Sequence, residues 1–382
     1  MSNLIRVIAL SLLALGMFIY PQEVLRSAGE GLTLWWRFVL PALLPFFVLS
    51  ELLMASGFVH FLGVLLESFM RPVFRLPGKA AFVVAMGYTS GFPMGAVLTA
   101  KLRNNKEITR EEGERLLAFT NNPSPGFMFG AVASGMLGEP TLGIVLAGSV
   151  YLSNLIVGFL FRFYKAAPKS LQSSSIPSFR RAWQEMNHAQ NRESRSFGQI
   201  LSDAVKQSTN TVLMVAGFMA IFSVILRLLN LWHVPLLLAT LSHRIIRILE
   251  VPVLQAFFNG LFEMTLGCQE AIQALSTLNQ QVAMLALIMG WGGLSVFAQI
   301  AGLISGTDLR FSSFLIARAL HAVIALGLSQ IFLSVAKVPT SSLPVRIVDP
   351  STLFWNSWQI SALVFLGCMS VLSILAIVRF RN

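Results

Sequence analysis

The chain has 382 residues, of which 55% are hydrophobic and only 12% are charged, and its mean hydropathy is +0.71. Soluble domains carry about 25% charged residues, so this composition excludes a large soluble domain and indicates a protein solvated by lipid. The formal net charge of +11 does not indicate nucleic-acid binding, because the basic residues lie between apolar runs, as in the cytoplasmic loops of membrane proteins.

Apolar runs recur along the whole chain. At about 20 residues each, there is room for roughly eight to eleven membrane segments. The runs lie at about residues 4–20, 38–54, 57–70, 80–98, 126–138, 141–163, 208–226, 228–241, 253–275, 282–305, 314–335 and 357–378. Those at 57–70, 126–138 and 228–241 are near 14 residues, a length typical of re-entrant or interfacial segments. The first run is interpreted as a retained helix, because no small-residue cleavage motif follows it directly.

A polar stretch separates the apolar runs into two groups. Between Lys165 and Ser196 the chain has a serine-rich segment and more basic than acidic residues, which is typical of a solvated cytoplasmic loop. Arg379 and Arg381 indicate that the C-terminal tail lies on the same side. The chain thus divides into an N-terminal membrane helix and connector (1–29), a first repeat (30–164), a polar basic linker (165–203), a second repeat (204–336), and a C-terminal loop with the last membrane helix (337–382).

A second polar island, Lys101 to Arg115, mixes five basic with four acidic residues. This mixture predicts an amphipathic surface helix. Thr109, followed three positions later by Glu112, fits a capping box.

The two groups of apolar runs can be aligned with an offset of roughly 169 to 176 residues. The segment 87–94 aligns with 263–270, so that Thr89 matches Thr265 and Gly91 matches Gly267. Further along, segment 120–126 aligns with 289–295. Each half therefore has two apolar segments that are interrupted by Gly, Pro or polar residues. The pattern favours an all-α polytopic membrane fold with two pseudo-symmetric, inverted repeats and broken or re-entrant helices.

Broken helices are costly in hydrocarbon, because each unpaired backbone group costs several kcal/mol. Secondary transporters place paired breaks near the membrane middle and aim helix N-termini at anionic groups of the substrate. Gly and Pro also serve packing and kinking in membrane helices, but four breaks in matching positions favour a substrate site. The candidate binding residues are Thr89, Ser90, Gly91, Thr120, Asn121, Asn122, Ser124, Thr265, Gly267, Gln269 and Ser295.

Ionisable residues inside apolar runs are a further signal, because an ionised group there costs a few kcal/mol or more. Glu263 and Glu270 lie seven residues apart, on one face of a continuous helix, and either could carry a coupling proton. Arg318 and His321 lie three apart and could contact an anion or relay a proton. Structural pairing of a carboxylate with Arg318 or Arg227 explains these residues equally well.

The common catalytic motifs are missing from the sequence. Gly78 and Lys79 do not form a phosphate loop, and neither G-x-S-x-G nor H-E-x-x-H occurs. The histidines show no paired ligand spacing, and Cys268 and Cys368 lie singly in apolar stretches. We therefore expect no enzymatic activity, no metal and no cofactor, and either passive movement or coupling to an ion gradient.

Four consecutive segments carry a resemblance to a known family: residues 87–96, 101–115, 116–125 and 126–133. They resemble the sporulation integral membrane protein family of YlbJ type, whose halves belong to the nucleoside-recognition or Gate domain group. The resemblance covers most of the chain from about residue 30 to 335. It implies a multi-pass protein of endospore-forming bacteria, located in a membrane of the mother cell or the outer forespore, and tied to the passage of dipicolinate toward the forespore.

Residues and resemblance together favour a transporter of a small organic anion, with dipicolinate moved from mother cell toward forespore. One alternative is a non-transporting assembly or signalling factor for spore maturation, with the basic linker binding other sporulation membrane proteins. A second alternative is a carrier of nucleoside-like solutes. The expected partners are the lipid bilayer, a small-molecule anion and other sporulation membrane proteins, without nucleic acid.

Overall fold

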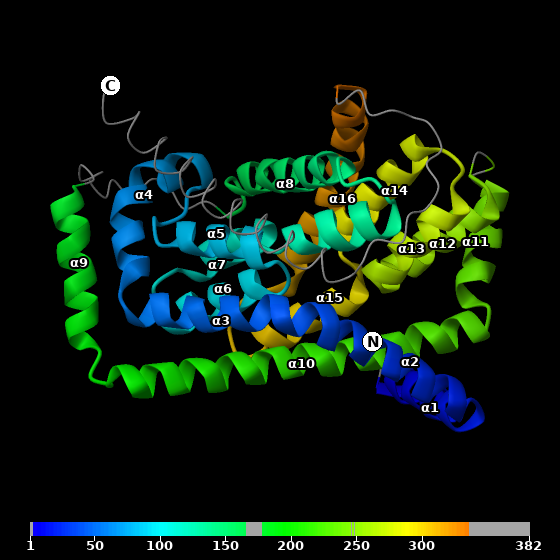
Figure 1. Ribbon diagram of the computed structural model, residues 1–382, viewed down its shortest axis with the longest axis horizontal. Helices are drawn as coiled ribbons and strands as arrows, with labels where there is room; N and C mark the ends of the chain where they lie inside the picture. The colour runs from blue at the N-terminus through cyan, green and yellow to red at the C-terminus, as the bar shows by residue number, and fades with distance from the viewer. Residues whose placement is uncertain (1–2, 166–177, 246, 248, 336–382) are drawn as a thin grey trace.

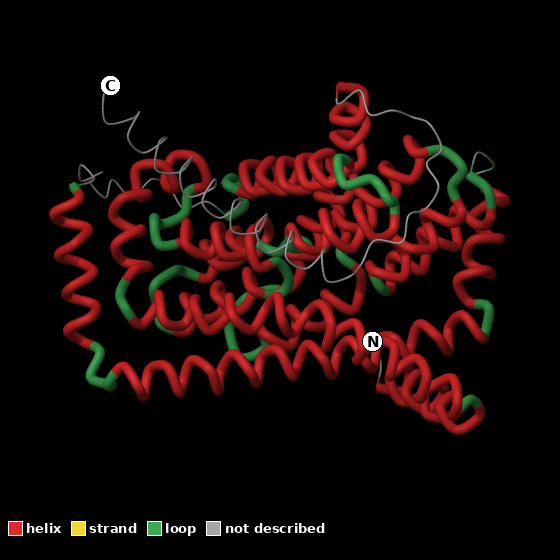
Figure 2. Tube along the Cα trace, in the orientation of Figure 1, coloured by secondary structure: helices red, strands yellow, loops and turns green. Residues whose placement is uncertain are grey.

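The computed structural model describes residues 3–165, 178–245, 247 and 249–335, and this part of the chain is helical without any strand (Figures 1 and 2). The predicted all-α architecture is confirmed. The predicted last membrane helix at 357–378 and most of the serine-rich linker segment lie outside the described residues.

Two long helical paths lie side by side. In the first, α2 (Pro21–Leu34), the π-helix η1 (Trp35–Val39) and α3 (Leu40–Ala55) follow one another without interruption. The second is α10 (Phe197–Leu231), whose 35 residues span ~52 Å, well beyond a hydrocarbon core of about 30 Å. α10 packs against both α2 and α3, and Trp35 donates a hydrogen bond from Nε1 to the Val212 carbonyl across the contact, at 3.0 Å.

The two long paths run in opposite directions. After α3 the chain bends by 82° into α4 (Phe58–Phe74), and after α10 it turns into α11 (Val234–Ile245). α9 (Phe179–Arg192), which leads into α10, packs against α4, so α10 begins where α3 ends. Figure 1 accordingly shows α4 and α11 at opposite ends of the molecule. This is the relation that inverted repeats require.

Each half then continues with the same order of helices. The first half has α5 (Ala80–Ser90), α6 (Met94–Asn104), α7 (Arg110–Phe119), η2 (Gly126–Met136) and α8 (Leu142–Phe161). The second half has α12 (Val251–Phe262), α13 (Met264–Ala274), α14 (Leu278–Trp291), α15 (Gly293–Ile304) and α16 (Phe311–Val335). Breaks separate the helices at residues 91–93, 120–124, 263 and 292, all four within the predicted segments.

In the described part of the chain, the helices that are long and apolar enough to cross a membrane are fewer than the apolar runs of the sequence. Among the described residues four are long and apolar enough, namely 142–161, 197–231, 278–304 and 311–335. Counting α1 (Asn3–Ile19) with α2, and α3 with α4, as bent spans raises the number to six at most. The runs at 80–98 and 253–275 each form two short helices that pack against each other in place of one long helix.

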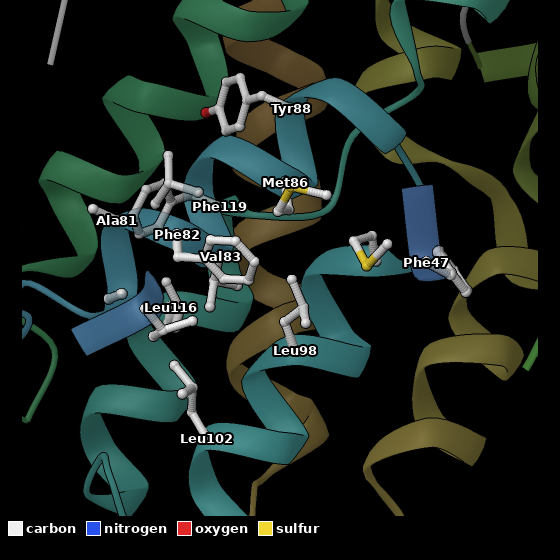
Figure 3. Packing of buried hydrophobic residues seen from close by; sticks show 14 of the residues in the cluster. Phe47, Ala81, Phe82, Val83, Met86, Tyr88, Leu98, Leu102, Leu116 and Phe119 are labelled. Carbon is white, nitrogen blue, oxygen red and sulfur yellow. The ribbon is translucent and has the colours of Figure 1, made fainter. Parts of the chain in front are cut away.

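A hydrophobic core holds the first pair of short helices in place. All eleven residues of α5 are buried. Around them lie Phe47 of α3, Leu98 of α6, and Leu116 and Phe119 of α7 (Figure 3). The ring of Phe119 stacks on Phe74 with a centroid distance of 4.8 Å. The helices that flank the breaks are therefore fixed by side-chain packing, and the breaks are positioned by them.

Candidate functional site

The four helix breaks lie close together. Within the first half, a β-carbon at Gly91 would lie 2.6 Å from the backbone nitrogen of Ser124, so the first break touches the second. Within the second half, a β-carbon at Gly293 would lie 3.1 Å from the nitrogen of Met264, so the third break touches the fourth. Such close approaches of backbone to backbone leave no room for a side chain, which is why glycine occupies these positions.

Arg318 of α16 joins the breaks of the two halves. Its Nη1 donates to the Asn121 carbonyl at 2.6 Å, and its Nε donates to the Trp291 carbonyl at 3.1 Å. Nη2 donates to the carbonyls of Met289, at 3.1 Å, and Gly290. The guanidinium also lies over the ring of Phe92, 5.4 Å from its centroid. One fully buried cation therefore contacts three of the four breaks.

Amide side chains hold the second break in the first half. Asn121 accepts a hydrogen bond on Oδ1 from the backbone nitrogen of Ala96, at 3.0 Å, which ties the break to the start of α6. Asn122 accepts on Oδ1 from Nδ2 of Asn154 at 2.6 Å. Both break residues and Asn154 have no exposed surface. The break is thus satisfied by neutral groups of its own half together with Arg318.

Several polar atoms at this centre have no partner within the described part of the chain. They are Oγ of Ser90, Nδ2 of Asn122 and Oδ1 of Asn154. Buried polar atoms are paired in the great majority of cases, so unpaired ones indicate a place for water or a ligand. Because the surrounding side chains are fully buried, the centre is closed in this conformation.

The two membrane carboxylates have no cationic partner among the described residues. Glu263 accepts on Oε2 from the Leu266 nitrogen at 2.8 Å and so caps α13. Glu270 accepts from Nδ2 of Asn259. Arg227 forms its ion pair with Glu23 of α2, at 2.7 Å. Among the described residues, the predicted structural pairing is therefore found for Arg227, with Glu23, whereas neither Glu263 nor Glu270 is paired with Arg318 or Arg227.

Comparison with known proteins identifies the family of this chain. A family model described as Gate, nucleoside recognition, matches residues 36–176. The chain is also 41% identical over 357 residues to the sporulation integral membrane protein YlbJ of Bacillus subtilis (strain 168), covering 89% of this chain and 86% of that protein. The chain belongs to the YlbJ family. It is a multi-pass integral membrane protein, as the resemblance implied. No solved structure matches it.

The structure brings several of the first-half candidate residues together. Ser90, Gly91, Asn121, Asn122 and Ser124 all lie at the two adjoining breaks. The hydroxyls of two further candidates are engaged within their own helices. Thr89 donates to the Ala85 carbonyl at 2.9 Å, and Thr120 donates to the Leu116 carbonyl at 2.9 Å.

The second-half candidates are only partly at the breaks. Ser295 lies in the first turn of α15 and is buried, next to the fourth break. Thr265, Gly267 and Gln269 instead lie inside α13, because the third break is at Glu263. Gly267 serves helix packing, since a β-carbon there would collide with Gly260 of α12. Gln269 is exposed. The predicted alignment of Gly91 with Gly267 is therefore wrong by about four residues.

Sequence reasoning missed three contributors. Phe92 and Trp291 contact Arg318 from two breaks, the latter through its carbonyl. Asn154 lies in the middle of an apolar helix and donates to both Asn122 and the Phe119 carbonyl. A polar residue in an apolar run was the available signal for Asn154, and it is the same signal that identified Arg318.

His321, one helical turn from Arg318, lies against the Val150 carbonyl, 2.8 Å from Nε2.

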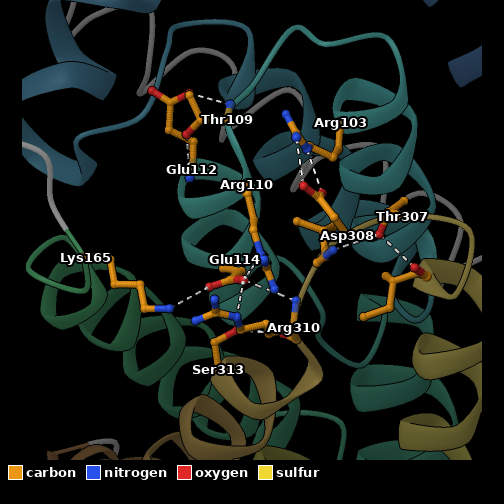
Figure 4. A network of polar contacts seen from close by, with 12 residues as sticks. Arg103, Thr109, Arg110, Glu112, Glu114, Lys165, Thr307, Asp308, Arg310 and Ser313 are labelled. Carbon is orange, nitrogen blue, oxygen red and sulfur yellow. Dashed lines mark hydrogen bonds and ion pairs between the residues drawn. The ribbon is translucent and has the colours of Figure 1, made fainter.

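A network of ion pairs ties the two halves together at one end of α7 (Figure 4). Arg103 of α6 forms two hydrogen bonds with Asp308, at 2.8 and 2.9 Å. The fully buried Glu114 of α7 accepts from Nε of Arg110 at 3.0 Å and from the backbone nitrogen of Arg310 at 3.2 Å. Asp308 and Arg310 belong to the loop between α15 and α16. The second half is thus bound to the first beside the closed centre.

The polar island at residues 101–115 supplies this network, and it is not a single surface helix. α6 ends at Asn104 and α7 begins at Arg110. The predicted capping box is confirmed, with the Glu112 nitrogen donating to Oγ1 of Thr109 at 3.2 Å. Arg115 is buried, and its guanidinium donates to the backbone carbonyls of Tyr164 and Arg75, each at 3.1 Å.

Proposed function

We propose that this chain carries a small organic anion, dipicolinate or a similar planar dicarboxylate, across a membrane during sporulation, from the mother cell toward the forespore. The name of the Bacillus subtilis relative supports the sporulation role. The observation that carries the anion assignment is Arg318, a fully buried guanidinium whose hydrogen bonds go to backbone carbonyls. A buried cation without a carboxylate partner among the described residues is suited to receive one from the solute.

Solute binding would replace the backbone carbonyls bound to Arg318 by a carboxylate of the solute, and this exchange provides the binding energy. Hydrogen bonds between guanidinium and carboxylate are charge-assisted on both sides and bidentate, and they are roughly twice as strong as neutral ones. Opening of the breaks therefore costs the carbonyl contacts of Arg318 but allows a stronger pair to form. Closing around the bound anion restores a dry centre, in which the pair is stronger still.

One helix N-terminus adds to the attraction. α15 begins at Gly292 without a side-chain cap, and a β-carbon at Gly292 would lie 3.7 Å from Nη2 of Arg318. Helix N-termini bind anions, so the guanidinium and the start of α15 act on the same carboxylate. The N-termini of α6 and α13 are already occupied, by the side chains of Asn121 and Glu263 respectively. The unpaired Ser90 and Asn122 groups are left to bind the second carboxylate.

Uptake of labelled dipicolinate into liposomes that hold the purified protein tests the proposal. We expect saturable uptake by the wild type and a clear loss in Asn122→Ala, because this variant removes an unpaired donor from the centre. Asn191→Ala, an exposed asparagine of α9, is the matched control and should transport as the wild type does. Absence of uptake under any imposed ion gradient would favour the assembly or signalling factor.

A nucleoside is the second solute to test, because the matching family model is described as nucleoside recognition. A neutral nucleoside cannot replace the carbonyl contacts of Arg318 with a charge pair, so we expect dipicolinate to be preferred. Uptake of labelled uridine without uptake of dipicolinate would show that the anion assignment is wrong while the carrier assignment holds.

A further inference from the structure

Glu270, like Glu263, has no cationic partner among the described residues, but it is bound by a side-chain amide, whereas Glu263 caps a helix. Glu270 is on α13, and its carboxylate accepts a hydrogen bond from Nδ2 of Asn259 on α12. Asn259 is fully buried and forms reciprocal amide hydrogen bonds with Asn230 at the end of α10, at 3.3 and 3.4 Å. Glu51 and Glu67, by contrast, have ion pairs with Lys101 and Arg71. Glu270 therefore has only neutral amides as described partners.

Among the described residues, the helices packed against α13 carry no group that could neutralise Glu270. α13 packs against α12, α14 and η2, and none of these three helices contains an acidic or basic residue or a histidine. The other titratable groups on α13 and at its cap are Cys268 and Glu263, neither of which is cationic. Arg227, one turn before Asn230, is bound to Glu23. An ionised carboxylate in such surroundings is costly, and binding a proton removes that cost.

We propose that Glu270 is a proton site that couples solute movement to a proton gradient, with Asn259 as the group that accommodates both of its states. An amide has a donor and an acceptor at its two ends. Asn259 donates to the ionised carboxylate as seen here, and after rotation of its amide it accepts from the protonated one. Asn230 has the matching donor and acceptor, so the amide pair persists in both states.

The position of Glu270 links the proton to the solute site. α12 and α13 pack against each other and are joined at the Glu263 break, which touches Gly293 at the fourth break. A change of charge between these helices therefore acts on the two helices whose break lies against the fourth break. The proton enters from the side of higher proton concentration, neutralises Glu270 while the anion is bound, and leaves on the other side. This inference rests on the proposed function of anion transport.

Two assays on the same liposomes separate coupling from transport. Counterflow, the exchange of labelled for unlabelled dipicolinate, needs no ion gradient, whereas accumulation against a concentration difference needs an ion gradient. With the membrane potential clamped at zero, a gradient of one pH unit supports about tenfold accumulation per coupled proton. We expect Glu270→Gln to retain counterflow and to lose accumulation driven by pH. Glu250→Gln, an exposed carboxylate before α12 without a capping bond, is the matched control and should retain both.

Other outcomes overturn the inference in distinguishable ways. Accumulation by Glu270→Gln at the wild-type level would show that Glu270 is not the coupling group. Wild-type accumulation on a sodium gradient but not on a pH gradient would exclude the proton. Loss of counterflow in a folded Glu270→Gln protein would place Glu270 in the solute path. Absence of counterflow in the wild type would refute anion transport itself.

Asn259→Ala provides a second test with a graded readout. It leaves the carboxylate in place but removes the donor that favours the ionised form, so the half-maximal proton concentration for accumulation should shift toward higher pH. An unchanged pH profile would contradict the role of Asn259.

Discussion

The two halves of the molecule share a frame of broken helices but differ in the chemistry of the breaks. In the first half neutral groups satisfy the backbone, with Asn121 and Asn154 bonded to the starts and ends of nearby helices. In the second half the break at Gly292 is satisfied by Arg318, which also reaches the first half at the Asn121 carbonyl. The two halves therefore share the arrangement of broken helices, but the side chains at the breaks differ. The first half offers neutral polar groups and the second half offers charge.

The largest effect is expected from removing the shared charge. Arg318→Met removes the guanidinium proposed to bind the solute carboxylate, and hydrogen bonds to charged groups are worth about 1.5–3 kcal/mol each, so loss of a bidentate pair should lower dipicolinate transport by about 100-fold or more. Arg318→Lys keeps the positive charge but lacks the planar guanidinium that binds a carboxylate with two hydrogen bonds, so its transport rate should lie between those of the wild type and Arg318→Met. The exposed Arg26→Met is the control. Transport by Arg318→Met at the wild-type rate would show that Arg318 does not bind the solute.

A steric change in the first half should act on stability. A β-carbon at Gly95 would collide with the Thr120 carbonyl, so Gly95→Ala should lower the free energy of unfolding by about 1–3 kcal/mol. Gly217 of α10 has open space around it, and Gly217→Ala should be neutral or stabilising. Thermal unfolding in detergent measures both. Equal melting temperatures for the two variants would mean that the first two breaks are not in close contact.

A smaller effect is expected at the capping box of α7, in the first half. Thr109→Ala removes the acceptor for the Glu112 nitrogen and should cost about 1 kcal/mol. Thr211→Ala is the control, because that exposed hydroxyl donates only to a carbonyl of its own helix. A comparison of the two unfolding curves would show no difference if the cap did not stabilise α7.

The smallest effect is expected at the exposed ion pair between the halves. The hydrogen bond from Arg103 holds the pKa of Asp308 below its ordinary value, so the pair is present at neutral pH and is lost as the pH falls through the lowered pKa. Arg103→Glu should modestly speed counterflow by weakening the closed state, and adding Asp308→Arg should reverse the change. A rate that is unaffected by either variant would show that this contact does not limit opening.

The sequence was informative about the breaks for a physical reason. Clusters of Gly, Pro and Asn inside apolar runs are unfavourable in lipid, so residues 91–93, 120–124 and 292 were recognisable. The third break was located less well, because Glu263 interrupts the helix without Gly or Pro, and the alignment followed Gly267, which serves packing.

The interactions between the halves could not be derived from the sequence. Arg318 was identified as a charge in an apolar run, but its acceptors are backbone carbonyls, which leave no mark in a sequence. The same holds for Arg115. The amide pair of Asn230 and Asn259 joins separate helices and likewise required the folded structure.

Equilibrium binding of labelled dipicolinate tests whether Arg318 and the helix breaks form an anion site. Labelled dipicolinate would be titrated onto the purified protein in detergent, with the wild type, Arg318→Met and the Arg26→Met control side by side. We expect saturable binding by the wild type and the control, competition by picolinate but not by pyridine, and loss of binding in a folded Arg318→Met protein. Unchanged binding by Arg318→Met would show that Arg318 is not part of an anion site.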